Sequence, residues 1–235
     1  MGIIREFTTF LKRPHYFEHK EKWSIQTIGS LFKLFGLKLV LTIIVYMTIT
    51  YIFSLFFEQS EMPKRASSIR ENMTLYRILS VIVLLPFIEE VLFRSWLRKK
   101  WALVYMPLIL CAIVLVLIFE LGNTTRNFVF LVALATVSIS LLASQAEIPE
   151  TGLVNRYVKR AFPVIFWGSA ILFALMHISN FSTYNEVGAF VVFLTSTQLV
   201  GGLFYGFICM RFSFSAAFLS HSFWNGSLVL IAAVV

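Results

Sequence analysis

The chain has 235 residues, of which 58% are hydrophobic and only 14% are charged, whereas an ordinary soluble domain is about 25% charged. This composition, with a mean hydropathy of +0.81, excludes a water-soluble globule and an intrinsically disordered chain, and it predicts a polytopic membrane protein. The formal net charge of +8 does not indicate nucleic-acid binding, because the cations are scattered between apolar runs, where membrane topology is a sufficient explanation.

Residues 1–33 form a segment ahead of the first long apolar run. Its apolar residues recur at helical spacing, which predicts a short amphipathic helix on the cytoplasmic membrane surface: Ile3, Ile4, Phe7, Phe10 and Leu11. A disordered tail is the alternative, since Pro14 interrupts the pattern. No cleavable signal peptide is expected, because no short apolar core is followed by a small-residue cleavage site.

The rest of the chain, residues 34–235, is predicted to form a single all-α transmembrane domain of about seven spans. Each span is close to the roughly 20 apolar residues that a bilayer requires. The sixth carries three glycines, which predicts a break or close packing. The predicted spans are residues 34–57, 75–97, 101–121, 128–143, 161–179, 187–212 and 214–235.

Positive charges in the short loops predict the orientation. With the N-terminus in the cytoplasm, thirteen of the 20 Lys and Arg fall in inner segments and four in outer ones, as the positive-inside rule requires. Lys38, close to the start of the first predicted span, is interpreted as a snorkelling side chain. The short loops favour the plasma membrane of a bacterium.

Several ionisable and polar residues interrupt the apolar spans, and each such group is a candidate for function because its insertion is costly. Glu90 and Arg94 are four residues apart and are expected to pair on one helix face. Glu89 is then left with no cation in its own span to compensate it. We therefore expect it to meet groups from two other spans in a wet cavity between helices: His177, His221 and Asn225.

Depth along the spans supports this convergence in part. Glu89 lies about nine residues before the basic run that ends its span, or roughly 13 Å, and His221 lies about ten residues beyond Arg211, or roughly 15 Å. His177 lies about 17 residues after Arg160, or roughly 25 Å. The fifth span must therefore begin outside the bilayer, or the cavity must reach past the midplane.

Three motifs resemble those of the intramembrane glutamic peptidases, the family of type II CAAX prenyl proteases and related bacterial Abi or bacteriocin-processing proteins. They are Glu-Glu-x-x-x-Arg at Glu89, Glu90 and Arg94, Phe-x-x-x-His at Phe173 and His177, and His-x-x-x-Asn at His221 and Asn225. The resemblance covers roughly residues 75–230. It departs from the family in the two spans that separate the first motif from the second, and an even number of inserted spans keeps those two helices antiparallel.

The resemblance implies hydrolysis of a peptide bond without a metal or other cofactor. Glu89 would activate a water that His177 holds or polarises, while His221 and Asn225 would donate hydrogen bonds to the developing oxyanion. Glu90 and Arg94 would orient the helix, with Phe173 and Asn180 in supporting positions. The expected partners are membrane lipid and a peptide or protein substrate, which could be lipidated.

Four other interpretations of the same residues remain open. Buried polar side chains can simply hold helices together, and Glu, His and His could bind zinc. A proton-coupled transporter would also use buried Glu and His, although no inverted repeat is visible. A non-catalytic scaffold or bacteriocin-immunity partner could retain all three motifs.

Overall fold

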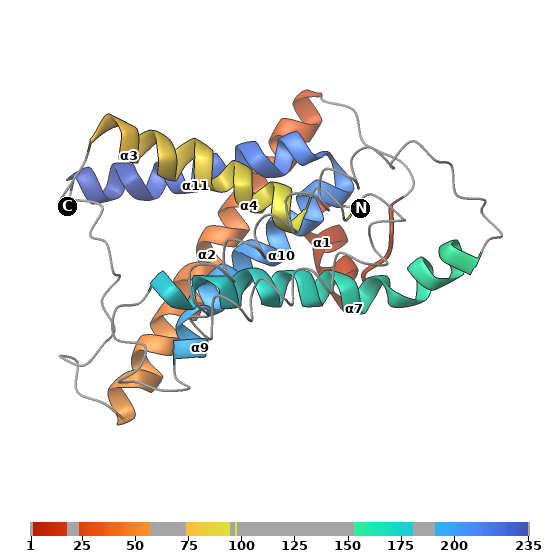
Figure 1. The fold of residues 1–235 in the computed structure, drawn as a ribbon, viewed down its shortest axis with the longest axis horizontal. Coiled ribbons are helices and arrows are strands. Elements are labelled where there is room, and N and C mark those ends of the chain that lie inside the picture. Colours follow the sequence, from red (N-terminus) through yellow and green to blue (C-terminus); the bar gives the residue numbers. More distant parts are fainter. Residues whose placement is uncertain are drawn as a thin grey trace, which may run out of the picture.

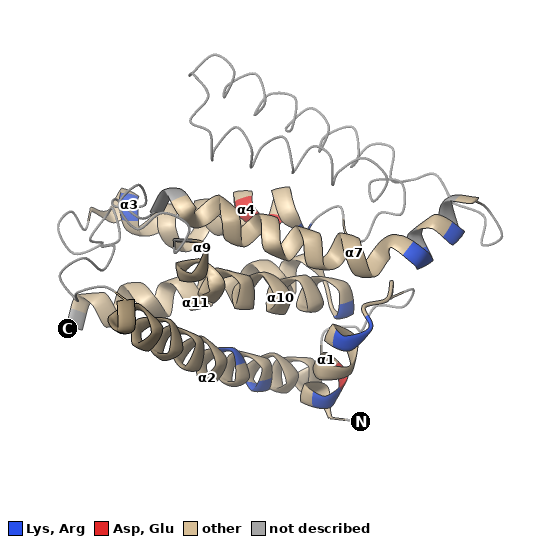
Figure 2. Ribbon diagram, turned by 90° about the horizontal axis from the view of Figure 1, so that it is seen from below, with Lys and Arg blue, Asp and Glu red and all other residues tan. Residues whose placement is uncertain are grey.

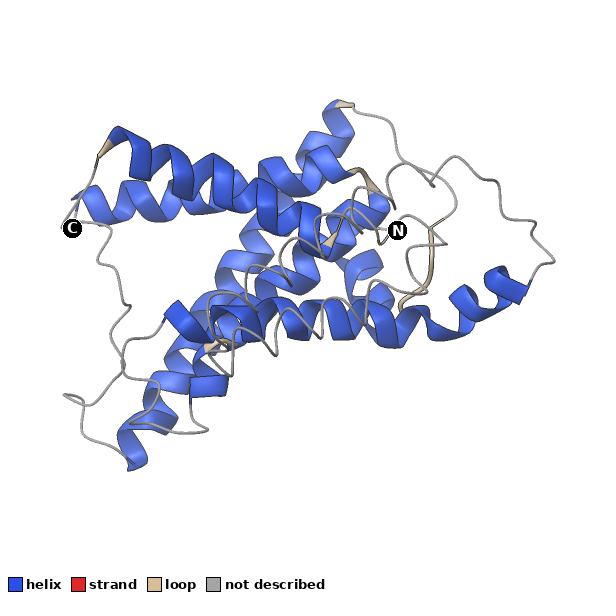
Figure 3. Ribbon diagram, viewed as in Figure 1, coloured by secondary structure: helices blue, strands red, loops and turns tan. Residues whose placement is uncertain are grey.

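The computed structural model describes residues 2–17, 24–56, 74–94, 97, 153–180 and 191–234 (Figure 1). Over these ranges the chain is helical and contains no strand (Figure 3), which confirms the predicted all-α class for the described residues. The elements are α1 (Ile3–Lys12), α2 (Ile25–Phe56), α3 (Leu75–Leu79), the π-helical turn η3 (Ser80–Leu84), α4 (Leu85–Phe93), α7 (Leu153–Met176), the 3-10 turn η4 (His177–Asn180), α9 (Val191–Leu194), α10 (Ser196–Arg211) and α11 (Phe214–Val234).

Three described helices are long and apolar enough to cross a bilayer, which supports a membrane protein: Ile25–Phe56, Lys159–Met176 and Phe214–Ala233. The predicted third and fourth spans lie outside the described residues, so the number of seven spans stays a prediction. The second predicted span consists of α3, η3 and α4 in succession. The sixth breaks at Thr195, between α9 and α10, and not at its glycines.

Helix α10 is the central element of the bundle and packs against α7, α11 and α2. Its second half is buried without interruption from Phe204 to Met210. Two of its glycines allow this close packing: a Cβ at Gly202 would lie 3.1 Å from the Ala170 carbonyl oxygen, and one at Gly206 would lie 2.8 Å from the Phe166 ring. Small residues are what bring membrane helices this close together.

Basic residues gather around α1, the beginning of α7 and the end of α10, at one end of the bundle (Figure 2). This distribution agrees with the predicted grouping of cations. That this end faces the cytoplasm stays a prediction. The beginning of α7 projects beyond the other helices (Figure 1). The described side chains of α7 up to Arg160 are exposed, whereas Phe162 and Phe166 are already buried, so the segment between Arg160 and His177 packs against the bundle.

The N-terminal helix forms as predicted, and the buried part of its apolar face, Ile3, Phe7 and Phe10, packs against other helices. Phe7 and Phe10 are each only 1% exposed. Phe7 packs on Phe204, with ring centroids 4.2 Å apart, and Phe10 packs edge-on against Phe166 at 4.9 Å. Glu6 also pairs with Arg211 at the end of α10. The disordered alternative is therefore wrong for α1, because this segment is a helix held by these aromatic contacts, whereas its place at the cytoplasmic membrane surface stays a prediction.

The glycine contact between α10 and α7 generates a testable prediction. Gly206→Ala should lower the Tm of the purified protein, because its methyl group must displace the buried Phe166 ring, and overpacking of this kind costs about 1–3 kcal/mol. Gly168→Ala is the matched control, since a Cβ there meets nothing within 4 Å and alanine favours helix. Equal Tm values for both variants in detergent would contradict the packing described here.

Candidate active site

Glu90 is the buried anchor of the polar cluster on α4. Its side chain is 0% exposed, and its Oε1 accepts a hydrogen bond of 2.9 Å from His221 Nδ1. Arg94 Nη1 lies 3.4 Å from the same oxygen, which confirms the predicted pair one helical turn apart. The Arg94 guanidinium carbon also lies 3.9 Å from the centroid of the Phe173 ring. Glu90 therefore ties α4 to α11, and Arg94 ties α4 to α7.

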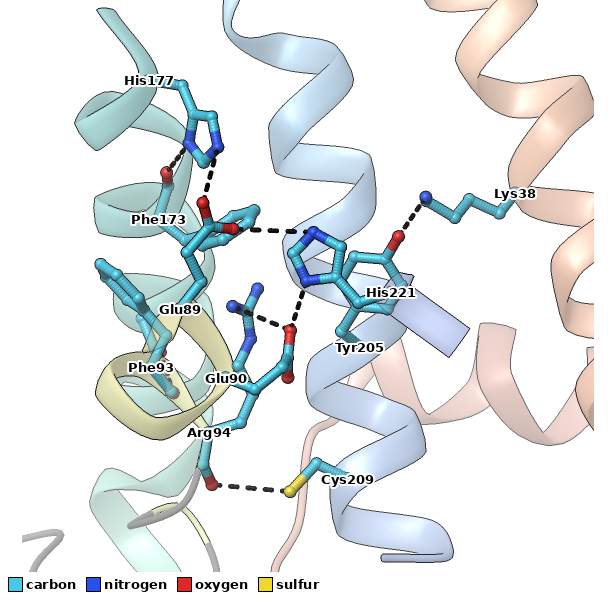
Figure 4. Close-up of polar contacts among 11 residues, drawn as sticks. Lys38, Glu89, Glu90, Phe93, Arg94, Phe173, His177, Tyr205, Cys209 and His221 are labelled. Carbon is cyan, nitrogen blue, oxygen red and sulfur yellow. Dashed lines mark hydrogen bonds and ion pairs between the residues drawn. The ribbon is translucent and has the colours of Figure 1, made fainter. Parts of the chain in front are cut away.

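Glu89 lies between two imidazoles from different helices (Figure 4). Its Oε1 is 3.8 Å from His177 Nε2, and its Oε2 is 3.6 Å from His221 Nε2. Its side chain retains 18% exposure, so the carboxylate is not sealed from small molecules. The structure thus brings together three of the residues that the sequence predicts to converge.

Each imidazole is held in place through its other nitrogen. His177 Nδ1 lies 2.8 Å from the Phe173 carbonyl oxygen, and His221 Nδ1 lies 2.9 Å from the Glu90 carboxylate. A carbonyl and a carboxylate only accept hydrogen bonds, so Nδ1 carries the hydrogen in both rings. In the neutral form of each ring, Nε2 is then an acceptor, and both Nε2 atoms face Glu89.

The end of α7 places His177 beside α4. The α-helix ends at Met176, and the 3-10 turn η4 starts at His177. One and two turns earlier, Phe173 packs edge-on against the Phe93 ring at 5.4 Å, and Ser169 Oγ donates 2.9 Å to the Phe93 carbonyl. These contacts fix α7 against α4, so the phenylalanine of the Phe-x-x-x-His motif supports its histidine directly.

Two predicted site residues are not brought to Glu89 by the described contacts. Asn225 Nδ2 donates 3.0 Å to the carbonyl oxygen of Val81, about two helical turns before Glu89. The expectation that Asn225 meets Glu89 is therefore not met, because a backbone carbonyl of η3 takes its amide group. Asn180 ends the turn η4, and its side chain lies outside what the structure describes.

Lys38 joins the cluster from α2, and the interpretation of it as a snorkelling side chain is wrong. Its side chain is buried, with Nζ 2.5 Å from the hydroxyl of Tyr205 and 3.4 Å from the centroid of the Trp224 ring. The Tyr205 ring in turn stacks on the His221 ring, with centroids 4.3 Å apart. The error comes from the helix boundary, since α2 begins at Ile25 and Lys38 is roughly 20 Å along it.

Sequence reasoning missed Tyr205 entirely, and the only signal for Lys38 was a lone cation inside an apolar run. Lys38, whose ammonium donates to Tyr205, is the second buried cation beside Arg94 in a cluster that holds two carboxylates. Arg94, at the end of α4, pairs with Glu90. With Lys38 from α2 added, the formal charges of these two cations match those of the two glutamates. This comparison of charges counts only the residues that the structure describes.

The chemistry available here is that of carboxylate and imidazole. No group of three His, Cys, Asp or Glu side chains within the described ranges is arranged to hold a metal ion. Comparison with known proteins gives no match, since no family model, curated protein or solved structure matches the chain. The site is therefore interpreted from its own geometry.

The contact between Lys38 and Tyr205 can be tested by a double-mutant cycle. Tyr205→Phe should lower the free energy of unfolding by about 1.5–3 kcal/mol, because it leaves the buried ammonium without its acceptor, and the Tm should fall by several degrees. In a Lys38→Met background the same substitution should cost much less. Additive Tm changes in detergent would show that the two groups do not interact.

Proposed function

We propose that this protein is an intramembrane endopeptidase of the glutamic type, which hydrolyses a peptide bond with a water activated by Glu89. The observation that supports this most strongly is the pair of imidazoles, each with Nδ1 fixed by an acceptor and Nε2 turned towards a different oxygen of Glu89. A cluster that only joined helices would satisfy its hydrogen bonds directly.

Neutral imidazole Nε2 and an ionised carboxylate are both acceptors, so in these protonation states a hydrogen donor shared by the two stabilises the arrangement. The separations of 3.6 and 3.8 Å exceed those of direct hydrogen bonds, which are about 2.7–3.2 Å. A water molecule can donate to a Glu89 oxygen and to a histidine nitrogen at once, and bridging waters of this kind are common in active sites. The geometry therefore favours a bound water as the reactant.

The two histidines are suited to different steps because different acceptors hold them. The carboxylate that accepts from His221 Nδ1 stabilises the imidazolium that forms if Nε2 takes a proton during the reaction, as in the Ser-His-Asp triad, and the Nε2–H can then donate to an oxyanion. His177 Nδ1 donates to a backbone carbonyl, which fixes the tautomer whose Nε2 can accept a hydrogen bond from the water. Glu90 acts through His221 and does not contact the reacting atoms.

The proposed reaction uses these groups in sequence. Glu89 takes a proton from the water as the water oxygen bonds to the carbon of the scissile carbonyl. The carbonyl oxygen becomes an oxyanion, the proton passes from Glu89 to the neighbouring His221 Nε2, and this Nε2–H donates a hydrogen bond to the oxyanion. The C–N bond then breaks as the proton returns through Glu89 to the amide nitrogen. The products are a carboxylic acid and an amine, and Glu89 is regenerated.

The order of the three motifs supports an assignment to the type II CAAX prenyl protease and Abi-like group. Under this proposal the chain crosses a bacterial plasma membrane about seven times, with its N-terminus in the cytoplasm and its site opening on that side. The substrate would be a membrane-associated peptide or protein, with or without a lipidated cysteine. Helix α4 ends just after Glu89, near the basic end of the bundle, which agrees with this orientation (Figure 2).

The central prediction concerns Glu89. In cells that express Glu89→Gln, peptides released from membrane proteins should be lost relative to the unaltered protein, because glutamine cannot take a proton from water. Loss of a general base typically costs 10²–10⁴-fold in rate. Comparative proteomics of membrane peptides measures this. Glu6→Gln, which alters a carboxylate outside the cluster, is the matched control and should leave the peptide set unchanged.

A purified assay then separates the alternatives. Two quenched fluorescent peptides, one with a farnesylated cysteine and one without it, test the dependence on a lipid. A protein whose biological effect survives Glu89→Gln, and whose membrane peptides do not change, would be a scaffold or immunity partner. Proton uptake that depends on Glu89 in proteoliposomes, without cleavage, would indicate a transporter.

Metal dependence gives an independent prediction. Exhaustive dialysis against EDTA and 1,10-phenanthroline should leave the glutamate-dependent cleavage unchanged, because in this mechanism Glu89 activates water without a Lewis acid. A zinc peptidase assayed in parallel controls for the chelation. Loss of cleavage that is restored by added zinc would replace the proposed mechanism with a metal-assisted one.

A further inference from the structure

The π-helical turn η3 (Ser80–Leu84) precedes the helix that carries both glutamates. The Leu85 N–H donates to the Ser80 carbonyl, five residues back, where an α-helix would use the carbonyl four residues back. Such a turn holds one more residue than an α-helical turn, and π-bulges are frequent at functional sites. It therefore determines how α4 is rotated about its axis relative to α3.

Pro86 leaves one carbonyl of this turn without its usual donor. In the five-residue pattern, the N–H that would reach the Val81 carbonyl belongs to residue 86, and proline has no N–H. A carbonyl inside a membrane needs a partner within the protein. Asn225 supplies that partner, with Nδ2 at 3.0 Å from the Val81 oxygen, and Pro86 itself is buried.

The rotation of α4 decides which side chain faces the imidazoles. Without the additional residue of η3, every side chain of α4 would turn by about 100° relative to α3. Glu89 would then take roughly the direction that Glu90 has now, and Ile88, which is 42% exposed at present, would take the direction of Glu89. The cluster would lose its free carboxylate.

We propose that Asn225 is a positioning residue, which holds the π-helical turn through the Val81 carbonyl and so directs Glu89 towards His177 and His221. This role rests on the proposed peptidase function and differs from direct donation to the oxyanion. It also explains the spacing of His221 and Asn225 on α11. One turn of that helix fixes the carboxylates, and the next fixes the irregular turn that presents them.

A compensating substitution tests this role. Asn225→Ala should reduce kcat for the quenched fluorescent peptide that the unaltered protein cleaves by roughly 100-fold, the scale expected for a small misplacement of a catalytic group. KM should change little. Pro86→Ala returns the missing N–H, so the variant with both substitutions should regain at least tenfold of the lost kcat. Pro86→Ala alone should stay close to the unaltered protein, since Asn225 still occupies the carbonyl.

Thermal unfolding in detergent tests the same coupling without any assay of cleavage. The Tm lost in Asn225→Ala should be largely recovered in the variant with both substitutions, and recovery of folded, monodisperse protein counts equally if the single variant fails to fold. If Pro86→Ala restores neither kcat nor Tm, the positioning role is wrong and Asn225 acts elsewhere. If Tm is recovered while no form cleaves any peptide, the positioning role stands and the proposed peptidase function fails.

Discussion

The structure depends on placing two adjacent carboxylates, Glu89 and Glu90, inside a bundle of apolar helices. A charge in such a place is tolerated only with partners from the protein. Glu90 is paired through its Oε1, with Arg94 on its own helix and with His221 on α11. Once α4 is fixed in that way, the side chain of Glu89 faces the space between α7 and α11. The five helices that contribute to this cluster therefore anchor one acid and leave the other partly accessible.

The sequence could predict this part of the site because helical geometry alone relates its members. A spacing of four residues pairs Glu90 with Arg94, and it places Glu89 about 100° away on the same helix. What the sequence could not give was the position of Lys38. The apolar run starts at residue 34, whereas α2 extends back to Ile25 through polar residues that still form helix. Which face of α2 meets Tyr205 is decided by packing against α10, which no local pattern encodes.

Asn225 shows a second limit of prediction from sequence. Its spacing from His221 correctly places both on one face of α11, and that face does meet the helix of the glutamates. The two helices are antiparallel, however, so moving from His221 to Asn225 along α11 leads from α4 back to η3. In η3 the chain departs from α-helical geometry. Pro86 is the only residue in the sequence that indicates this irregularity. The partner of Asn225 is therefore a backbone group, which pattern matching among side chains does not consider.

The charge balance of the cluster bears on the kind of chemistry it favours. Within the described part of the chain, the formal charges of Lys38 and Arg94 match those of the two glutamates. Hydrolysis moves a proton from the bound water to Glu89 and on to the leaving amine, so the summed charge of the cluster and its bound reactants is the same at each step. Proton-coupled transport requires the cluster to gain and release a net proton, and a low-dielectric interior opposes that change unless a compensating ion moves with it. A balanced cluster with one partly accessible carboxylate therefore suits catalysis on a neutral peptide bond better than it suits transport.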